Sequence, residues 1–226
     1  MTGAGSLTLT RNALNGLLSA STLGNVTDSY TYNGFAEPTN YNAKLGMTII
    51  YDVNYSYDKL GRITQKIETI GGVTTTYDYG YDATGRLTTV TINGTPQPLV
   101  TYGYDGNDNR TNINIGGNIT NASYDAQDRL TNYGATSYSY TLNGELNSKT
   151  IGGNTTQFNY DVLGNLRNVT LPDTTQIEYV IDAQNRRIGK KVNGTLTQGF
   201  LYQDQLEPVA ELDGSNNIIS RFVYGT

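Results

Sequence analysis

The chain alternates short runs rich in tyrosine and threonine with breaks rich in glycine and asparagine. Within the runs, aromatic residues often stand two positions apart, as in Tyr55/Tyr57 and Tyr79/Tyr81. Residues two apart on a strand point to the same face of the sheet. Tyrosine and threonine favour strands, whereas glycine and asparagine favour turns. The pattern therefore predicts many short β-strands separated by tight turns, with little helix.

The pattern repeats along the chain, and one residue before the first turn of each unit serves as its anchor. By subtraction, successive anchors are 25, 24, 23, 20, 16, 20, 21, 21 and 22 residues apart. A period of this kind indicates one supersecondary unit copied along the chain, so we expect about nine units. The anchors are Tyr32, Tyr57, Tyr81, Tyr104, Tyr124, Tyr140, Tyr160, Ile181, Tyr202 and Tyr224.

The first turn of each unit follows the anchor. Glycine, asparagine and aspartate tolerate a positive φ angle at the lowest cost, and seven of eight residues four positions after the anchor are of these types. We expect a four-residue hairpin turn that ends in a left-handed residue, with a distorted turn at Ala36. The Asp or Asn next to the anchor can accept hydrogen bonds from N–H groups of the same turn. The eight residues are Ala36, Gly61, Gly85, Asp108, Asp128, Gly144, Gly164 and Asn185.

A second kind of turn falls about half a repeat later. Gly-Gly and Asn-Gly between strand-forming runs are strong hairpin signals. Two kinds of turn that alternate along the chain predict an all-β antiparallel meander of repeated hairpins. The second turns are expected at Gly71-Gly72, Asn93-Gly94, Gly116-Gly117, Gly152-Gly153 and Asn193-Gly194.

Four stretches carry the first turn as nearly the same heptapeptide, namely YDKLGRI, YDATGRL, YDAQDRL and YDVLGNL. One aspartate per repeat gives spaced charges, whereas a calcium site needs several converging carboxylates. We therefore predict a structural role: tyrosine packs, aspartate caps the turn, glycine takes the positive φ, and arginine pairs with aspartate or stacks on a tyrosine of the next repeat. The motif residues are Tyr57, Asp58, Gly61, Arg62, Tyr81, Asp82, Gly85, Arg86, Tyr104, Asp105, Tyr124, Asp125, Arg129, Tyr140, Gly144, Tyr160, Asp161 and Gly164.

About nine two-strand units make roughly 18 strands, which at about 4.8 Å per strand would extend roughly 85 Å. Open twisted sheets rarely exceed about 10 strands without curling. We therefore expect the sheet to curl into a spiral, as part of a shell or tube.

The heptapeptides at this spacing resemble the YD repeats of the Rhs (rearrangement hotspot) family, which occur in bacterial polymorphic toxins, Tc toxin shell components and teneurins. The stretch FLYQDQLEPVAELDGSNNIISRFVYGT, residues 200–226, resembles a sequence that comes late in many bacterial Rhs arrays. The resemblance implies an Rhs/YD-repeat array over residues 27–226, preceded by a degenerate repeat or N-terminal cap over residues 1–26.

The resemblance also implies a function. YD-repeat sheets of toxins form a hollow shell that encloses a toxin chain, and those of teneurins form an extracellular adhesion module. We accordingly expect a structural module, secreted or on the cell surface, whose partners are the remainder of a larger Rhs-type protein, neighbouring copies paired through edge strands, or an enclosed toxin. No self-cleavage motif like that of the toxin relatives is found, so no protease residues are assigned.

Composition narrows the chemistry. The chain contains neither His nor Cys, which removes triad and thiol nucleophiles and most transition-metal sites. We therefore predict no enzyme activity, no cofactor and no metal. The 15 basic and 20 acidic residues give a net charge of −5 without a basic cluster, which disfavours a nucleic-acid partner. No apolar run marks a signal peptide or a membrane span.

Three alternatives stay open. Tyrosine rows could bind a glycan or a protein partner if their rings are exposed. Free edge strands could join copies into a filament or tube. A pair of carboxylates could act as a glycosidase, although no local pattern selects two.

Overall fold

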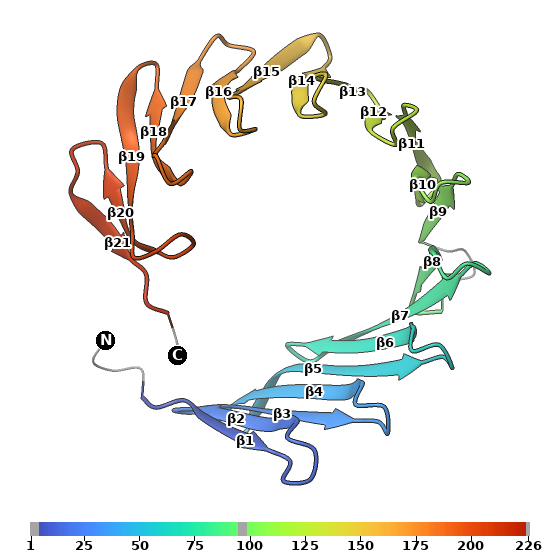
Figure 1. Cartoon of the computed structure of the whole chain (residues 1–226). Coiled ribbons are helices and arrows are strands. Elements are labelled where there is room, and N and C mark those ends of the chain that lie inside the picture. Colours follow the sequence, from blue (N-terminus) through green and yellow to red (C-terminus); the bar gives the residue numbers. More distant parts are fainter. Residues whose placement is uncertain (1–4, 95–98, 225–226) are drawn as a thin grey trace. The chain divides into compact units, whose positions relative to one another are not determined.

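The computed structural model describes residues 5–94 and 99–224, which fold into two compact units, residues 1–120 and residues 121–226. The described residues form strands and turns, without a helix (Figure 1). Unit 1 contains β1 (Thr8–Arg11), β2 (Leu18–Leu23), β3 (Val26–Tyr32), β4 (Pro38–Leu45), β5 (Thr48–Tyr57), β6 (Ile63–Ile70), β7 (Val73–Tyr81), β8 (Leu87–Ile92), β9 (Val100–Tyr104) and β10 (Arg110–Ile115). The boundary between the units falls within β11 (Asn118–Tyr124).

Unit 2 continues with β12 (Leu130–Tyr133), β13 (Thr136–Tyr140), β14 (Leu146–Ile151), β15 (Asn154–Tyr160), β16 (Leu166–Thr170), β17 (Gln176–Ile181), β18 (Arg187–Val192), β19 (Thr195–Tyr202), β20 (Pro208–Asp213) and β21 (Ile218–Arg221). Within each unit, strands that follow one another in the chain pair antiparallel. The prediction of an all-β antiparallel meander of hairpins is confirmed.

The second turns adopt the backbone conformation that Gly-Gly and Asn-Gly favour. Between β6 and β7, Gly71 and Gly72 have φ values of 56° and 83°, and Ile70 pairs with Val73 directly across the hairpin. Positive φ at both central residues defines a two-residue type I′ turn, whose twist matches that of the flanking strands. A two-residue hairpin turn also occurs where sequence analysis did not place it, between Tyr133 and Thr136, but there only the first central residue, Gly134, has a positive φ. We call the edge formed by these turns the glycine-turn margin.

The sheet of each unit is a single layer with very little core. Only four hydrophobic residues among those described are buried, namely Ala43, Val53, Val169 and Ala210. The accessible surface is 14762 Å², whereas two separate compact proteins of half this mass would together expose about 12,000 Å². The hydrogen-bond ladder and contacts along the sheet must therefore supply stability that a compact domain takes from its interior.

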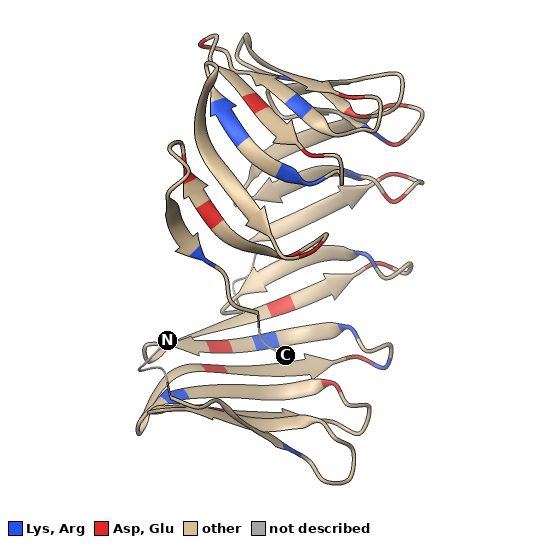
Figure 2. Cartoon of the chain, turned by 60° about the vertical axis from the view of Figure 1, so that its left-hand side comes forward, with Lys and Arg blue, Asp and Glu red and all other residues tan. Residues whose placement is uncertain are grey.

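The two faces of the sheet differ in chemistry. In unit 1, Tyr30 lies opposite Tyr41, and Tyr41 lies opposite Val53 on the next strand. We call this side the tyrosine face. The other side carries polar pairs such as Thr69 and Thr74, whose hydroxyls lie 2.8 Å apart. Charged residues are spread over the strands and turns of both units (Figure 2).

Candidate functional site

In eight repeats the first turn is a closed hairpin turn with a left-handed residue at its fourth position, whereas the turn after Tyr202 has no residue with a positive φ. In the turn between β7 and β8, the N–H of Asp82 donates to the carbonyl of Arg86 at 3.0 Å, and the N–H of Gly85 donates to the carbonyl of Asp82 at 3.1 Å. Gly85 has a φ of 94°. All eight residues expected at this position have a positive φ, including Ala36 at 64°.

The distortion expected at Ala36 is absent. The N–H of Ala36 donates to the carbonyl of Asn33 at 3.1 Å, and the N–H of Asn33 donates to the carbonyl of Glu37 at 3.0 Å, as in the other turns. The expectation was wrong because the strain of one alanine in the left-handed region is only about 1–2 kcal/mol. The pairing of β3 with β4 holds the turn in place, together with Oδ1 of Asn33, which accepts the N–H groups of Phe35 and Glu37.

Six of the ten anchors are followed by an aspartate, and this aspartate holds its own turn. One carboxylate oxygen of Asp58 accepts the N–H groups of Leu60 and Arg62 at 2.8 and 3.1 Å. The other oxygen accepts Nε and Nη2 of Arg62, both at 2.7 Å. The same pair of backbone bonds recurs at every aspartate of this kind, namely Asp82, Asp105, Asp125, Asp161 and Asp182.

These contacts lower the pKa of the carboxyl groups. For Asp58 and Asp182 the largest contribution to the lower pKa comes from the backbone N–H of the residue four positions later, Arg62 and Arg186, and the guanidinium adds to it. For Asp82 the side chain of Arg86 contributes most to the lower pKa. The carboxylates are therefore charged at neutral pH, as a turn that pairs with arginine requires.

The arginine of the motif links one repeat to the next. Each of four arginines that pair with the aspartate of their own turn also covers the ring of the next anchor tyrosine. The distances from the guanidinium carbon to the ring centre are 4.6 Å for Arg62 over Tyr81 and 4.8 Å for Arg86 over Tyr104. They are 4.9 Å for Arg129 over Tyr140 and 5.1 Å for Arg186 over Tyr202. These distances are within the range of a cation–π contact.

Arg86 makes further contacts across the repeat boundary. Its Nη1 donates to the carbonyl of Asp105 at 3.0 Å and to Oδ1 of Asp108 at 2.6 Å, both in the next turn. Pairing with aspartate and stacking on tyrosine, which sequence analysis offered as alternatives, thus occur together on one side chain.

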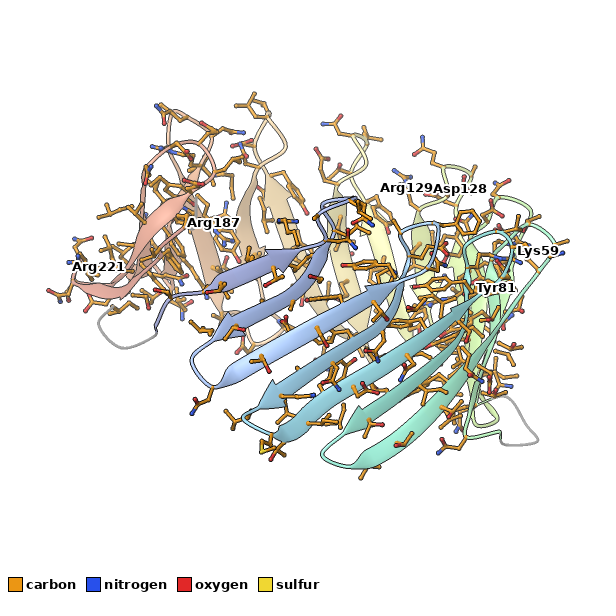
Figure 3. All side chains as sticks on the ribbon, turned by 90° about the horizontal axis from the view of Figure 1, so that it is seen from below. Lys59, Tyr81, Asp128, Arg129, Arg187 and Arg221 are labelled. Atoms are coloured by element: carbon orange, nitrogen blue, oxygen red, sulfur yellow. The ribbon has the colours of Figure 1, made fainter. Side chains whose placement is uncertain are left out.

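The hydroxyl groups of the anchor tyrosines also bind the preceding repeat. The hydroxyl of Tyr81 donates to the carbonyl of Ile63 at 2.7 Å, and that of Tyr104 donates to the carbonyl of Leu87 at 2.7 Å. In each case the acceptor is the first strand residue after the turn of the preceding repeat, as it also is for the hydroxyls of Tyr32, Tyr57, Tyr140, Tyr202 and Tyr224. Figure 3 labels Tyr81 at the end of β7, on the margin that also carries Lys59. We call this edge the YD-turn margin.

In these four repeats, aspartate, arginine and the next tyrosine therefore form a clamp. The aspartate fixes the arginine, the arginine covers the next ring, and the hydroxyl of that ring binds the backbone beside the first turn. Sequence analysis missed the bond from the hydroxyl to the carbonyl. Its only signal was the choice of tyrosine over phenylalanine at nine of the ten anchors.

Some repeats replace the arginine. Asn33 Nδ2 binds Oε2 of Glu37 in the turn between β3 and β4, and the hydroxyl of Thr141 binds Oε2 of Glu145 in the turn between β13 and β14. In the turn of Asp161, Asn165 stands at the arginine position and binds the carboxylate at 3.1 Å. The remaining glycines of the motif keep their positive φ, at 97° for Gly144 and 81° for Gly164, so the turn is retained where the clamp is altered.

Tyr81→Phe is expected to lower the free energy of unfolding by about 1 kcal/mol, because it removes the bond to the carbonyl of Ile63 while the ring stays. Tyr79→Phe is a matched control two residues earlier on the same strand and face, and should change it by less than about 0.5 kcal/mol. Urea unfolding followed by circular dichroism measures both. Equal effects of the two variants would show that the hydroxyl bond adds nothing.

The raised pKa values of several tyrosines predict that the chain unfolds at alkaline pH. Burial raises the pKa of Tyr81, Tyr104 and Tyr140, and burial followed by the bond to Glu68 raises the pKa of Tyr51 to about 12. A group whose pKa is higher in the folded state stabilises it fully below the unfolded pKa, about 10 for tyrosine, and loses that contribution as pH rises through the folded pKa. Stability should thus fall steeply between about pH 10 and 12, measured by circular dichroism beside tyrosinate absorbance. Ionisation of all tyrosines at about pH 10 without unfolding would contradict it.

In the described part of the chain, no group of three or more acidic side chains is placed to hold a metal ion. The described residues also include no helix long and apolar enough to cross a bilayer.

Comparison with known proteins places these features in a family. The family model for the teneurin YD-shell matches residues 1–226. Human Teneurin-4 is 38% identical over 95 residues, which cover 40% of this chain and 3% of the relative. The tRNA3(Ser)-specific nuclease WapA of Bacillus spizizenii is 32% identical over 111 residues, which cover 42% of this chain and 4% of the relative.

Two solved structures share the fold. A Photorhabdus luminescens Tc holotoxin pore matches 96% of this chain and 15% of its own with a TM-score of 0.51 and 14% identity. A crystal structure of TcdB2-TccC3-TEV matches the same shares with a TM-score of 0.50 and 15% identity. The chain thus spans a small part of each relative it matches. Its repeats, its antiparallel meander and the family match over its whole length agree, and the chain belongs to the teneurin YD-shell family.

Proposed function

We propose that this chain forms part of the wall of a hollow β-sheet shell that encloses a toxin or another cargo polypeptide, on a secreted or cell-surface protein. The observation that carries the proposal is the single-layer sheet, in which four clamps join one repeat to the next. A wall must present two uncovered faces and still resist opening. The hydrogen-bond ladder and the contacts of Arg62, Arg86, Arg129 and Arg186 with the following tyrosines stabilise such a sheet without a core.

The proposed role is mechanical and involves no chemistry by this chain. The nuclease activity in the name of WapA belongs to that whole protein, 4% of which this chain matches. The motif residues that could have formed an active site are bound to one another within and between turns, as in the triad of Asp58, Arg62 and Tyr81. We accordingly expect no cleavage of tRNA by the purified chain.

A chimera tests the wall function. In it, this chain replaces the structurally equivalent strands of a Tc toxin shell, and protection of the enclosed polypeptide from added protease is measured. We expect protection equal to that of the unmodified shell. A control chimera with Asp52→Pro in β5 should lose this protection. Proline cannot donate a hydrogen bond to the neighbouring strand and is excluded from central strands. Rapid digestion of the cargo in the first chimera, despite an intact fold, would contradict the proposal.

A further inference from the structure

The repeat from β15 to β18 has no clamp, because both of the residues that would form it are replaced. Asn165 stands at the position of the arginine, and Ile181 stands at the position of the next anchor tyrosine. An arginine and a tyrosine occur two residues away instead, Arg167 after Asn165 and Tyr179 before Ile181. Both lie on strands, Arg167 on β16 and Tyr179 on β17. Their side chains are therefore available for a purpose other than joining turns.

Three cationic side chains surround the ring of Tyr179 on one face of the sheet. Lys190 lies directly opposite Tyr179 on β18. The guanidinium carbon of Arg187, also on β18 and labelled in Figure 3, is 5.1 Å from the centre of the ring. On the other side, the antiparallel register of β16 and β17 brings Arg167 opposite Tyr179. Since neighbouring strands are about 4.8 Å apart, the long side chains of Arg167 and Lys190 can reach one small ligand over the ring.

The positive charges of this cluster are only partly neutralised. The ion pairs of the described residues include neither Arg187 nor Lys190. Arg167 forms a long ion pair, with 3.7 Å between its Nη1 and Oδ2 of Asp161. That carboxylate already accepts two backbone N–H groups of its own turn and the side-chain amide of Asn165. The three cations thus share one carboxylate, which is committed to a turn.

Hydrogen bonds do not fix the guanidinium group of Arg167. Its Nε is buried and has no partner among the described residues, although a buried donor without a partner is unfavourable. The side chain as a whole is 37% exposed, so part of it is open to solvent. A rotation about its last bonds would turn the group toward an acceptor that enters from solvent. The unpaired donor therefore points, independently of the charge, to an acceptor as the ligand.

Unit 1 contains a comparable contact that is neutralised. Nζ of Lys66 lies 4.3 Å from the centre of the Tyr77 ring, and it also binds Oε1 of Glu68 at 3.2 Å. A lysine beside a tyrosine ring can therefore have its own carboxylate in this sheet. Lys190 beside Tyr179 has none among the described residues.

The neighbouring strand β19 adds no carboxylate to the cluster, because its sequence contains none. Gln198 lies opposite Lys190 on this strand. Nε2 of Gln198 donates to Oε1 of Glu211 on β20 at 2.6 Å, so that carboxylate is bound one strand further from the cluster. The chain as a whole has a net charge of −5. The excess of positive charge is therefore local, and it selects an anion as the ligand.

We propose that Arg167, Arg187 and Lys190 form a binding site for a phosphate group over the ring of Tyr179. Guanidinium groups donate paired hydrogen bonds to phosphate, and an ammonium group adds a compact charge. Three cations and the carboxylate of Asp161 leave a net charge of +2, and a phosphate group carries about −1.5 to −2 at pH 7. The hydroxyl of Tyr179 can donate as well, since no described residue binds it. The phosphate is either the free ion or a monoester on a larger molecule.

NMR titration of the whole chain with inorganic phosphate tests the site, because it gives both the affinity and the location. Saturable shifts are expected in the backbone amides of β16 to β18. Lys190→Gln should weaken binding at least about tenfold, because it removes a charge-assisted contact. Lys149→Gln is the matched control, since Lys149 also lies opposite a tyrosine, Tyr138, four strands away on β14. It should change the dissociation constant by less than about twofold, because exposed charges more than about 10 Å apart are largely screened.

Phosphoserine and acetate complete the test. Tighter binding of phosphoserine than of inorganic phosphate would support a monoester as the ligand, and the reverse order would support the free ion. Acetate should bind at least about tenfold more weakly, since it carries a single charge. Equal affinity for acetate, or equal weakening by the two lysine variants, would overturn the proposal. So would a wild-type chain whose β16 to β18 signals do not respond to phosphate. These outcomes leave the wall function untouched, since the cluster takes no part in the clamps.

Discussion

Gly214→Ala is expected to lower the free energy of unfolding by about 1–3 kcal/mol, as overpacking does in well-ordered sites. Gly214 follows Asp213 in the turn between β20 and β21. A Cβ atom at this position would lie 2.2 Å from the backbone carbonyl oxygen of Leu196 and 3.1 Å from its carbonyl carbon. A backbone group of β19 cannot rotate away as a side-chain tip can, so the hairpin of β20 and β21 must shift. Chemical denaturation and hydrogen exchange of β21 measure the effect.

Gly34→Ala is the matched control for this variant. Gly34 follows Asn33 as Gly214 follows Asp213, and neither glycine has a positive φ. A Cβ atom at Gly34 would meet nothing within 4 Å. Alanine there should be neutral or stabilise by up to about 1 kcal/mol through the unfolded state. If both variants have the same stability, the close approach of Leu196 does not constrain the turn.

Val53→Asp is expected to be the most destabilising change on the tyrosine face, by about 3–4 kcal/mol, since it buries an unpaired carboxylate. Val53 is 1% exposed at the centre of β5, between Tyr41 on β4 and Glu68 on β6. The new carboxylate would also face Glu68 directly across the sheet, where like charges repel. Burial raises the pKa of such a group, so the deficit relative to wild type should shrink as pH falls from about 7 to about 4.

Two controls accompany Val53→Asp. Val53→Thr keeps the shape and adds only a hydroxyl, so it should cost about 1–3 kcal/mol. Val73→Asp places the same charge at a site that is largely in water and should change stability by less than about 0.5 kcal/mol. Thermal unfolding of the three variants at both pH values gives the comparison. A Val53→Asp variant as stable as Val73→Asp would mean that solvent reaches the centre of the tyrosine face.

The local part of the fold could be read from the sequence because hairpin turns depend on a few adjacent residues. Gly71 and Gly72 required a type I′ turn, and Asp58 with Gly61 required the longer turn, whatever lay beyond the strands. Alanine is unfavourable at a positive φ, yet Ala36 adopts a φ of 64° and the turn forms. There the pairing of β3 with β4 outweighed the preference of one residue.

The clamp could be predicted only in part. Asp82 and Arg86 are only four residues apart in sequence, so their pairing follows from the turn. The contacts of Arg86 with Tyr104 and of Tyr104 with Leu87 depend on sheet register and on a repeat length that varies from 16 to 25 residues. Nothing in the heptapeptide specified that the tyrosine hydroxyl would bind a backbone carbonyl 17 residues earlier.

The sequence by itself determined the strands, the two kinds of turn and the family, because each follows from local preferences repeated along the chain. The tertiary structure alone decided which contacts join the repeats, which glycine lies against a backbone, and which apolar residues are left in water at the margins. Gly34 and Gly214 occupy the same position in two turns of the same kind. A Cβ atom would contact a neighbouring strand only at Gly214. Distances between strands arise from twist and register, which depend on the whole sheet and are not encoded in any single repeat.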